Sequence, residues 1–289
     1  MSLEVWGMML SGIAALAAGL ILARTRFAAA SGAAKIVVLG PVFEAVALAM
    51  FAAEHFTAAN DLKGIVPHWL PGSLFWTYFV GVALLAAAVS FITWQMVRWS
   101  AGALALFFLL IVVLVSLPSL PHNAGDRFAW ILTVRETGFA AGALVLAGSQ
   151  WKRGSSIGPA FMATGRYVLG AIMIFYAVEH FLHPLFVLGV PLEKPMPGWM
   201  PAPVLFAWLV GLTLLAGGVG LFFRRTVSIA SAVAGAVLVL VTAFFYLPIF
   251  LMETHSALAV EGLNYIGDTL LFGATVLLAG YAGIETEDA

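Results

Sequence analysis

The sequence predicts an all-α fold, a polytopic membrane helix bundle with about nine transmembrane helices. Two observations support this prediction. Hydrophobic residues make up 63% of the chain and charged residues only 9%, whereas soluble domains contain roughly 25% charged residues. The apolar residues also form long runs, and each run reaches the ~20 residues that a helix needs to cross a bilayer.

Nine spans are expected near residues 4–23, 36–56, 73–96, 101–117, 127–149, 160–182, 203–223, 226–247 and 261–283. Most spans are apolar on every side, so hydrophobic periodicity does not show which face meets lipid. The fourth span is expected to stop at Pro118, because helix-breaking residues cluster at 118–125.

The distribution of basic residues predicts how the chain is oriented, because cytoplasmic loops carry an excess of lysine and arginine. Alternate loops on one side hold Arg24, Arg26, Lys35, Arg98, Lys152, Arg153, Arg166, Arg224 and Arg225. The opposite side holds only Lys63, Arg127 and Lys194. The chain is therefore expected to be a multi-pass protein of the cell (inner) membrane, with an extracytoplasmic N-terminus and a cytoplasmic, acidic C-terminal tail at residues 285–288.

One motif occurs twice. Glu-His-Phe at residues 54–56 ends an apolar segment and is followed by Pro-x-Trp-x-Pro at 67–71; the same pattern recurs at 179–181 and 197–201. Because four spans return the chain to its starting side, the two halves should be parallel repeats. A pseudo-two-fold axis along the membrane normal would relate them.

The repeat divides the chain into three predicted parts. Residues 1–35 form an N-terminal transmembrane helix with a basic loop, 36–150 the first four-helix repeat, and 151–289 the second. The N-terminal helix lies outside the repeat and is expected to pack on the first half.

Charge and cysteine content exclude several classes of function. The net charge is -1 and no basic run occurs, so no nucleic-acid partner is expected. Without cysteine, the chain has neither disulfides nor thiolate metal sites. The expected partners are the lipid bilayer, a small-molecule ligand and a redox partner protein.

A set of Glu and His side chains is expected at the extracytoplasmic ends of the helices. Glu54, His55, Glu179 and His180 could line a small-molecule or quinone pocket, or simply end two helices at the wet interface. A third interpretation is a metal site with His55, His180 and His183 as ligands, or a haem held between His55 and His180. Pro184 disfavours helical geometry at His183, which weakens the metal interpretation.

Four ionisable residues lie deeper in the predicted spans, where charges are costly and usually face a bundle interior. Glu44 and Arg135 lack charged counterparts in the second half, which predicts a structural ion pair between them. Glu136 and Asp268 occupy matching positions, so both halves retain an acid. These two acids could accept protons or hydrogen-bond a substrate, or could bond neighbouring groups of the fold.

These motifs resemble the DoxX-like family of four-span membrane proteins. The resemblance rests on Glu54, residues 66–71, residues 76–81 and the closing helix with Glu136, and more weakly on Glu179, residues 196–201, Trp208 and Gly211. It implies a four-helix bundle in each half and an association with membrane oxidoreductases, such as a thiosulfate:quinone oxidoreductase subunit. The chain differs from the family in being a fused tandem copy with an added N-terminal span.

Two functions follow as expectations. The first is a quinone- or redox-linked membrane oxidoreductase subunit with an outward-facing Glu/His site. The alternative is a non-enzymatic small-molecule carrier or binding protein in which Glu136 and Asp268 contact the ligand. The sequence leaves the cofactor unknown, with a quinone as the favoured candidate and a metal or haem as the less favoured one.

Overall fold

The computed structural model describes residues 1–152, 154–256 and 258–284, and in this part of the chain the regular structure is helical. Nine of the described helices are long and apolar enough to cross a membrane, which confirms the predicted membrane helix bundle. They span Leu3–Ala29, Ala34–Thr57, Ser73–Thr93, Val97–His122, Arg127–Ser149, Ile157–Leu182, Pro203–Leu221, Val227–Glu253 and Ala259–Ile284.

Several of these spans consist of more than one helix. The principal helices are α1 (Leu3–Ala29), α3 (Gly40–Thr57), α5 (Ser73–Thr93), α6 (Val97–Ile111), α8 (Arg127–Ser149), α9 (Ile157–Leu182), α10 (Pro203–Leu221), α11 (Val227–Val241) and α13 (Ala259–Ala279). Short helices connect or extend them: α2 (Ala34–Val37), α4 (Ala59–Leu62), α7 (Leu117–Ser119), α12 (Leu247–Glu253) and α14 (Tyr281–Ile284).

Local sequence explains where several helices begin. The Ser2 hydroxyl accepts a hydrogen bond from the Val5 amide at the start of α1, and the Asp126 carboxylate does the same for Phe128 at the start of α8. Such N-caps satisfy amides that have no partner inside the helix. Helices α3 and α10 instead begin with proline in the first turn, where its missing N–H costs nothing.

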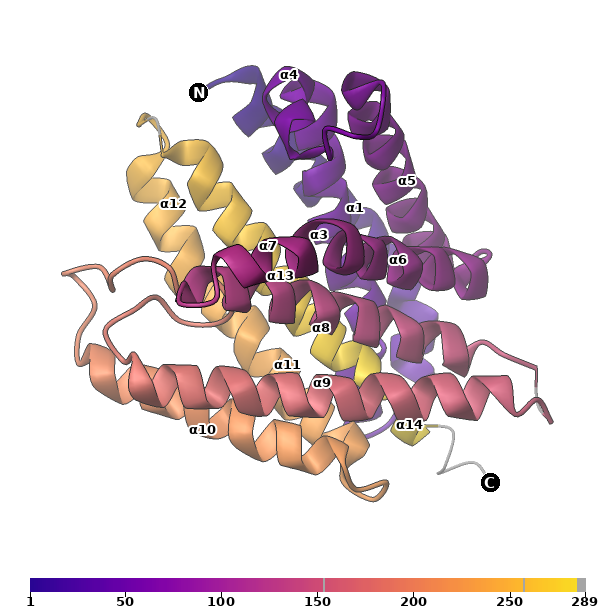
Figure 1. The fold of residues 1–289 in the computed structure, drawn as a ribbon. Coiled ribbons are helices and arrows are strands. Elements are labelled where there is room, and N and C mark those ends of the chain that lie inside the picture. Colours follow the sequence, from indigo (N-terminus) through magenta and orange to yellow (C-terminus); the bar gives the residue numbers. More distant parts are fainter. Residues whose placement is uncertain (153, 257, 285–289) are drawn as a thin grey trace.

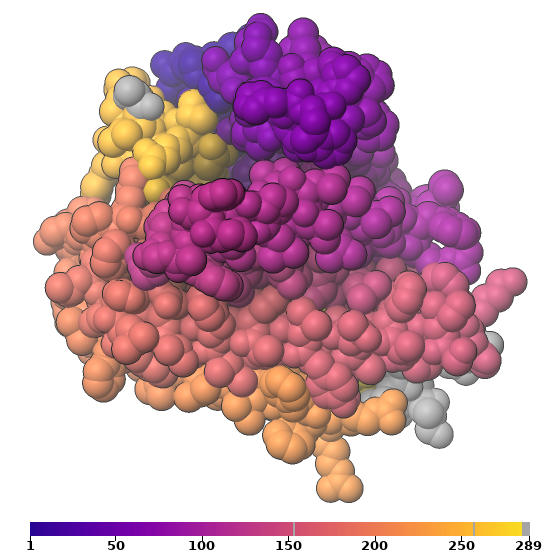
Figure 2. Space-filling view, viewed as in Figure 1, coloured from indigo at the N-terminus to yellow at the C-terminus, as the bar shows by residue number. Residues whose placement is uncertain are grey.

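Helix α13 forms the centre of the bundle. Its span has the most buried apolar window of the nine, and it packs against α3, α8 and α11. Helices α1, α3 and α5 stand together, while α8, α9 and α10 lie side by side (Figure 1). As expected, α1 packs on the first half, against α3 and α5. Figure 2 shows this N-terminal part, indigo to purple, as a block above the magenta and orange helices.

Two spans run further than predicted. The fourth continues to His122 and the eighth to Glu253, although both contain a Leu-Pro step. In each case a π-helical segment, Val112–Ser116 or Thr242–Tyr246, comes directly before that step. Proline lacks an N–H and clashes with the carbonyl one turn earlier. The wider π-turn accommodates this clash, so the span is not broken at Pro118 or Pro248.

The fold supports a multi-pass membrane protein, while its sidedness and the identity of the membrane stay predictions. The acidic residues of the tail, 285–288, and Arg153 in a predicted basic loop lie outside the described residues.

Candidate functional site: a histidine-ended groove between α5 and α6

The second Glu-His pair is buried and has a structural role. His180 is fully buried, its Nδ1–H donates to the Tyr176 carbonyl at 2.7 Å, and its Nε2 accepts from the Gly189 amide at 3.0 Å. Both ring nitrogens are therefore used within the fold. This corrects the assignment of His180 as a metal ligand or a haem clamp.

The loop that His180 holds is itself buried. Residues 187–192 are inaccessible to solvent although they connect α9 to α10, and loops normally run over the surface. The Tyr246 hydroxyl donates to the Leu188 carbonyl, and Arg127 donates to the Leu192 carbonyl while pairing with Glu179 at 3.0 Å. Three backbone polar groups of this inserted loop are thus satisfied by side chains from α8, α9 and η4 (Thr242–Tyr246).

The first Glu-His pair is arranged differently. The Glu54 carboxylate accepts a hydrogen bond from the Asn264 amide at 2.9 Å on α13. His55, about 100° further round the helix, lies toward α5, where its Cβ touches Gly81. Its Nδ1–H donates to the Phe51 carbonyl at 2.8 Å. Within the described residues Nε2 has no hydrogen-bond partner, so its lone pair is free.

The four residues predicted to form one shared site are thus separated. Glu54 bonds α13, His55 lies against α5, Glu179 pairs with Arg127, and His180 bonds the inserted loop. Nor do His55, His180 and His183 form the predicted metal site: within the described residues, no group of three or more His, Asp or Glu side chains is arranged to hold a metal ion.

His55 lines a large apolar groove. The groove has a volume of about 430 Å³ and lies between the loop after α3, the outer half of α5 and the end of the α6 span. Its walls are aliphatic and aromatic, with Trp69, Trp76, Phe79 and Phe107 among them. Trp76 and Thr77 already donate to the Pro71 and Ser73 carbonyls. The imidazole Nε2 is therefore a free nitrogen acceptor in this groove.

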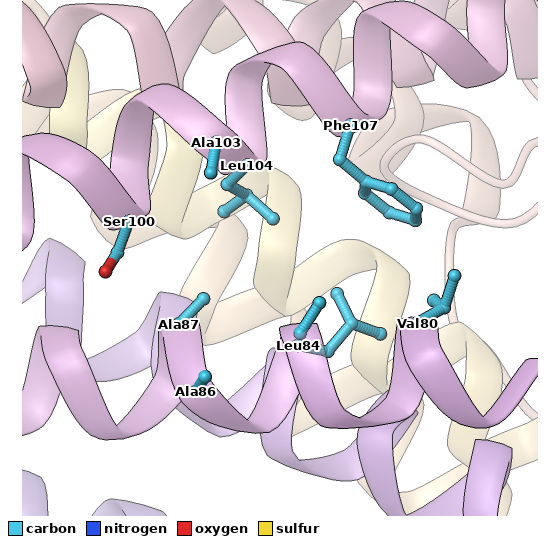
Figure 3. Close-up of a pocket in the computed structure, with 9 residues that line it drawn as sticks. Val80, Leu84, Ala86, Ala87, Ser100, Ala103, Leu104 and Phe107 are labelled. Atoms are coloured by element: carbon cyan, nitrogen blue, oxygen red, sulfur yellow. The ribbon is translucent and has the colours of Figure 1, made fainter. Parts of the chain in front are cut away.

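The groove continues inward along the same helix pair. A second cavity of about 230 Å³ shares Val80 and Phe107 with the first and extends toward Ser100. Figure 3 shows why space remains: Ala86 and Ala87 of α5 face Ala103 of α6, and these small side chains do not fill the gap between the helices. Together the two cavities make an elongated apolar slot with a histidine at one end.

A related groove lies between α10 and α11. Its volume is about 480 Å³, and its walls include Met200, Phe206, Val237 and Phe244. No histidine lines it, since the corresponding His180 is buried under the inserted loop. Both helix pairs therefore carry a groove, and the free imidazole belongs to the groove between α5 and α6.

The deep charges form a different network from the one predicted. Arg135 pairs with Asp268 at 2.6 Å and with the neighbouring Glu136 at 3.2 Å. Glu44 is fully buried, and its carboxyl meets the Thr275 hydroxyl at 3.5 Å. The predicted Glu44–Arg135 ion pair is thus wrong. Helix α13 packs against both α3 and α8, and its polar side chains supply the partner of each residue.

Asn264, Asp268 and Thr275 form a polar stripe on α13, since residues four and seven apart share a helix face. The stripe contacts Glu54, then Arg135, then Glu44. The sequence interpretation missed Asn264 and Thr275. Their spacing from Asp268 in an otherwise apolar span was the signal that could have found them.

Glu193, which was also missed, follows the inserted loop. Burial of its carboxyl raises the pKa of Glu193 to about 7, helped by Asp268 and Glu261 and opposed by Arg135 and Lys194. A raised pKa means that the folded state binds this proton more tightly than the unfolded chain does. Glu193 should therefore make the protein less stable as the pH rises from about 4.5 to 7.

We expect Glu193→Gln to weaken this loss of stability. The melting temperature of the detergent-solubilised protein, measured from pH 5 to 8, should fall less in the variant than in the wild type. Glu253→Gln, at the partly exposed C-terminal end of α12, serves as the control. Parallel curves for the wild type and Glu193→Gln would contradict the assigned titration.

The fold and this groove define an integral membrane helix bundle with an apolar slot that ends in a free histidine. Residues 44–119 match the model of a family described as "Domain of unknown function (DUF8561)". The match runs from α3 to α7 and includes His55 and both walls of the slot. No curated protein and no solved structure matches the chain significantly. The resemblance to the DoxX-like family stays a prediction.

Proposed function

We propose that this protein is a redox-linked membrane subunit that binds a quinone-class molecule in the groove between α5 and α6. The observation that supports this most is the free Nε2 of His55 at the outer end of an apolar slot. A quinone has the matching shape and polarity, with a flat head bearing two oxygens and a long apolar tail. The head would lie at His55 and the tail along Ala87 and Ala103.

The chemistry of His55 suits both redox states of such a ligand. With Nδ1–H bound to the Phe51 carbonyl, the neutral ring accepts a hydrogen bond from a quinol hydroxyl at Nε2. After taking up a proton, the same nitrogen donates to a quinone carbonyl. Histidine changes charge within the physiological range. Oxidation of a quinol to a quinone releases two protons and two electrons. His55 would receive one proton, the second would pass to water, and a redox partner protein would take up both electrons.

We further propose that residues 36–150 and 151–289 are two repeated halves, related by a pseudo-two-fold axis along the membrane normal. Three paired features support it. A π-segment precedes Leu-Pro in each half. His55 and His180 each donate to the carbonyl four residues earlier. Each half also carries a groove between its second and third spans.

Replacing His55 with leucine should weaken quinone binding. Losing a hydrogen bond in an apolar site costs about 1–3 kcal/mol, so the Kd of a short-tailed quinone, decylubiquinone, should rise roughly tenfold. Quenching of tryptophan fluorescence measures the binding, because Trp69 and Trp76 line the groove. Ala87→Phe, which fills the inner slot, should weaken binding as well.

The control is His122→Leu, which removes an exposed histidine outside the groove. It should leave the Kd of decylubiquinone unchanged. If His55→Leu and Ala87→Phe both bind the quinone as tightly as the wild type does, the groove is not its site.

A non-enzymatic carrier is the second candidate, and the polar stripe on α13 favours it. Asn264, Asp268 and Thr275 extend along the most buried span, where ionisable residues often mark a substrate path. If vesicles that contain the protein take up a substrate, and the protein binds no decylubiquinone, the carrier function is supported.

A further inference from the structure

Arg26 is a partly buried cation whose terminal nitrogens have no counter-ion among the described residues. It lies in the last turn of α1, and both terminal nitrogens, Nη1 and Nη2, are inaccessible and have no hydrogen-bond partner within the described residues. Its guanidinium carbon lies 3.9 Å from the centre of the Trp94 ring. Stacking on the indole covers one face of the guanidinium but leaves its in-plane N–H donors unsatisfied.

Three other buried or partly buried arginines, Arg166, Arg135 and Arg127, are paired. Arg166 donates to the Leu221 carbonyl at 2.5 Å and to the Tyr167 hydroxyl at 2.7 Å. Arg135 binds two carboxylates, and Arg127 one. A guanidinium cannot lose its charge in a protein, and leaving such a charge buried and unpaired is strongly unfavourable. Arg26 therefore indicates an anion that the chain itself does not supply among its described residues.

A second unpartnered polar group lies beside the same tryptophan. Tyr281 is only 8% exposed, its hydroxyl is buried without a hydrogen-bond partner, and its ring stacks on Trp94 with centroids 6.0 Å apart. Trp94 thus contacts both the guanidinium and the phenol. Two orphan donors, one from α1 and one from α14, are held at the same end of the bundle.

The backbone that presents Trp94 is strained. Trp94 and Met96 have positive φ angles of 61° and 55°, although neither is glycine. Such conformations cost of order 1–3 kcal/mol each and cluster at functional sites. The Ser90 hydroxyl donates to the Gln95 carbonyl at 2.5 Å and closes this turn between α5 and α6.

We propose that Arg26, Tyr281 and Trp94 bind the phosphate of an anionic phospholipid head. The guanidinium offers paired N–H donors that match phosphate oxygens, the Tyr281 hydroxyl adds a further donor, and Trp94 is the platform beneath. A phospholipid is the source because Leu20, Ile21 and Leu22, just before Arg26 on α1, are 45–62% exposed and would contact its acyl chains. A turn of the partly exposed Arg26 side chain brings the nitrogens to the headgroup.

The lipid site is independent of the quinone groove and can be tested separately. Native mass spectrometry of the delipidated protein with added phosphatidylglycerol should show at least one tightly bound lipid. We expect Arg26→Gln to weaken that binding about tenfold and Tyr281→Phe about threefold. Arg24→Gln is the matched control, because it removes the same charge from an exposed position of the same helix.

Melting temperatures show whether a variant loses lipid binding because it is less stable. In lipid-free detergent, Arg26→Gln should melt no lower than the wild type, because it removes an unpaired buried charge. Phosphatidylglycerol should raise the melting temperature of the wild type and of Arg24→Gln but not of Arg26→Gln. Equal loss of binding in Arg24→Gln and Arg26→Gln would overturn the site. Equal stabilisation by inorganic phosphate would overturn the lipid as its ligand.

Discussion

Asp268→Asn is expected to destabilise the protein by up to about 3–5 kcal/mol, the cost of breaking a buried ion pair by removing one partner. Asp268 holds Arg135 at 2.6 Å, and both side chains are at most 16% exposed. Glu136 remains at 3.2 Å, but its bond uses a different nitrogen of the guanidinium. The free energy of unfolding in mixed detergent, measured by titration with a denaturing detergent, checks this value.

The double variant Arg135→Gln with Asp268→Asn should be more stable than Asp268→Asn alone. The guanidinium is then absent, and Glu136, which loses its cation, can take up a proton and stay neutral. Glu44→Gln is the control: it changes an equally buried acid that has no cation partner among the described residues. Glu44→Gln should lower the free energy of unfolding by less than about 1 kcal/mol, since glutamine keeps the shape and the hydrogen-bonding capacity of a neutral carboxyl. If the double variant is no more stable than Asp268→Asn, the pair does not act as a unit.

His180→Ala should cost about 3 kcal/mol or more. It leaves the Gly189 amide without an acceptor, at about 1–3 kcal/mol, and creates a cavity where a fully buried ring stood. The inserted loop, residues 187–192, should detach before the helices separate. Hydrogen exchange followed by mass spectrometry would detect faster exchange in that loop, and the unfolding titration gives the total loss.

The two comparison variants are His55→Ala and His183→Ala. His55 makes one hydrogen bond, to a carbonyl of its own helix, and His183 is 36% exposed, so both should lose clearly less stability. An equal loss in all three variants, with unchanged exchange in residues 187–192, would contradict the structural role of His180.

The paired Glu-His motifs show how far sequence reasoning extends. Their positions at the ends of α3 and α9 were predictable, because each motif closes an apolar run of spanning length. Their different roles were not. In the first half the loop after the helix leaves His55 facing a groove, while in the second half the loop folds inward and takes up His180. Both connections, residues 58–72 and 183–202, are mixed in composition, and only packing decides which one enters the bundle.

The sequence by itself determined the membrane class, the number of spans and which ionisable residues lie deep, since these properties depend on composition and on distance along a helix. The partners of these ionisable side chains follow only from the tertiary structure. The sequence estimate places Glu44 and Arg135 at similar depths, but their partners on α13, Thr275 and Asp268, lie seven residues and about 10 Å apart along that helix. Arg135 therefore reaches Asp268, and Glu44 reaches Thr275. The slot between α5 and α6 likewise depends on which small residues face each other. The rotation of each helix about its axis sets this, and a helix that is apolar on every side does not reveal its rotation in the sequence.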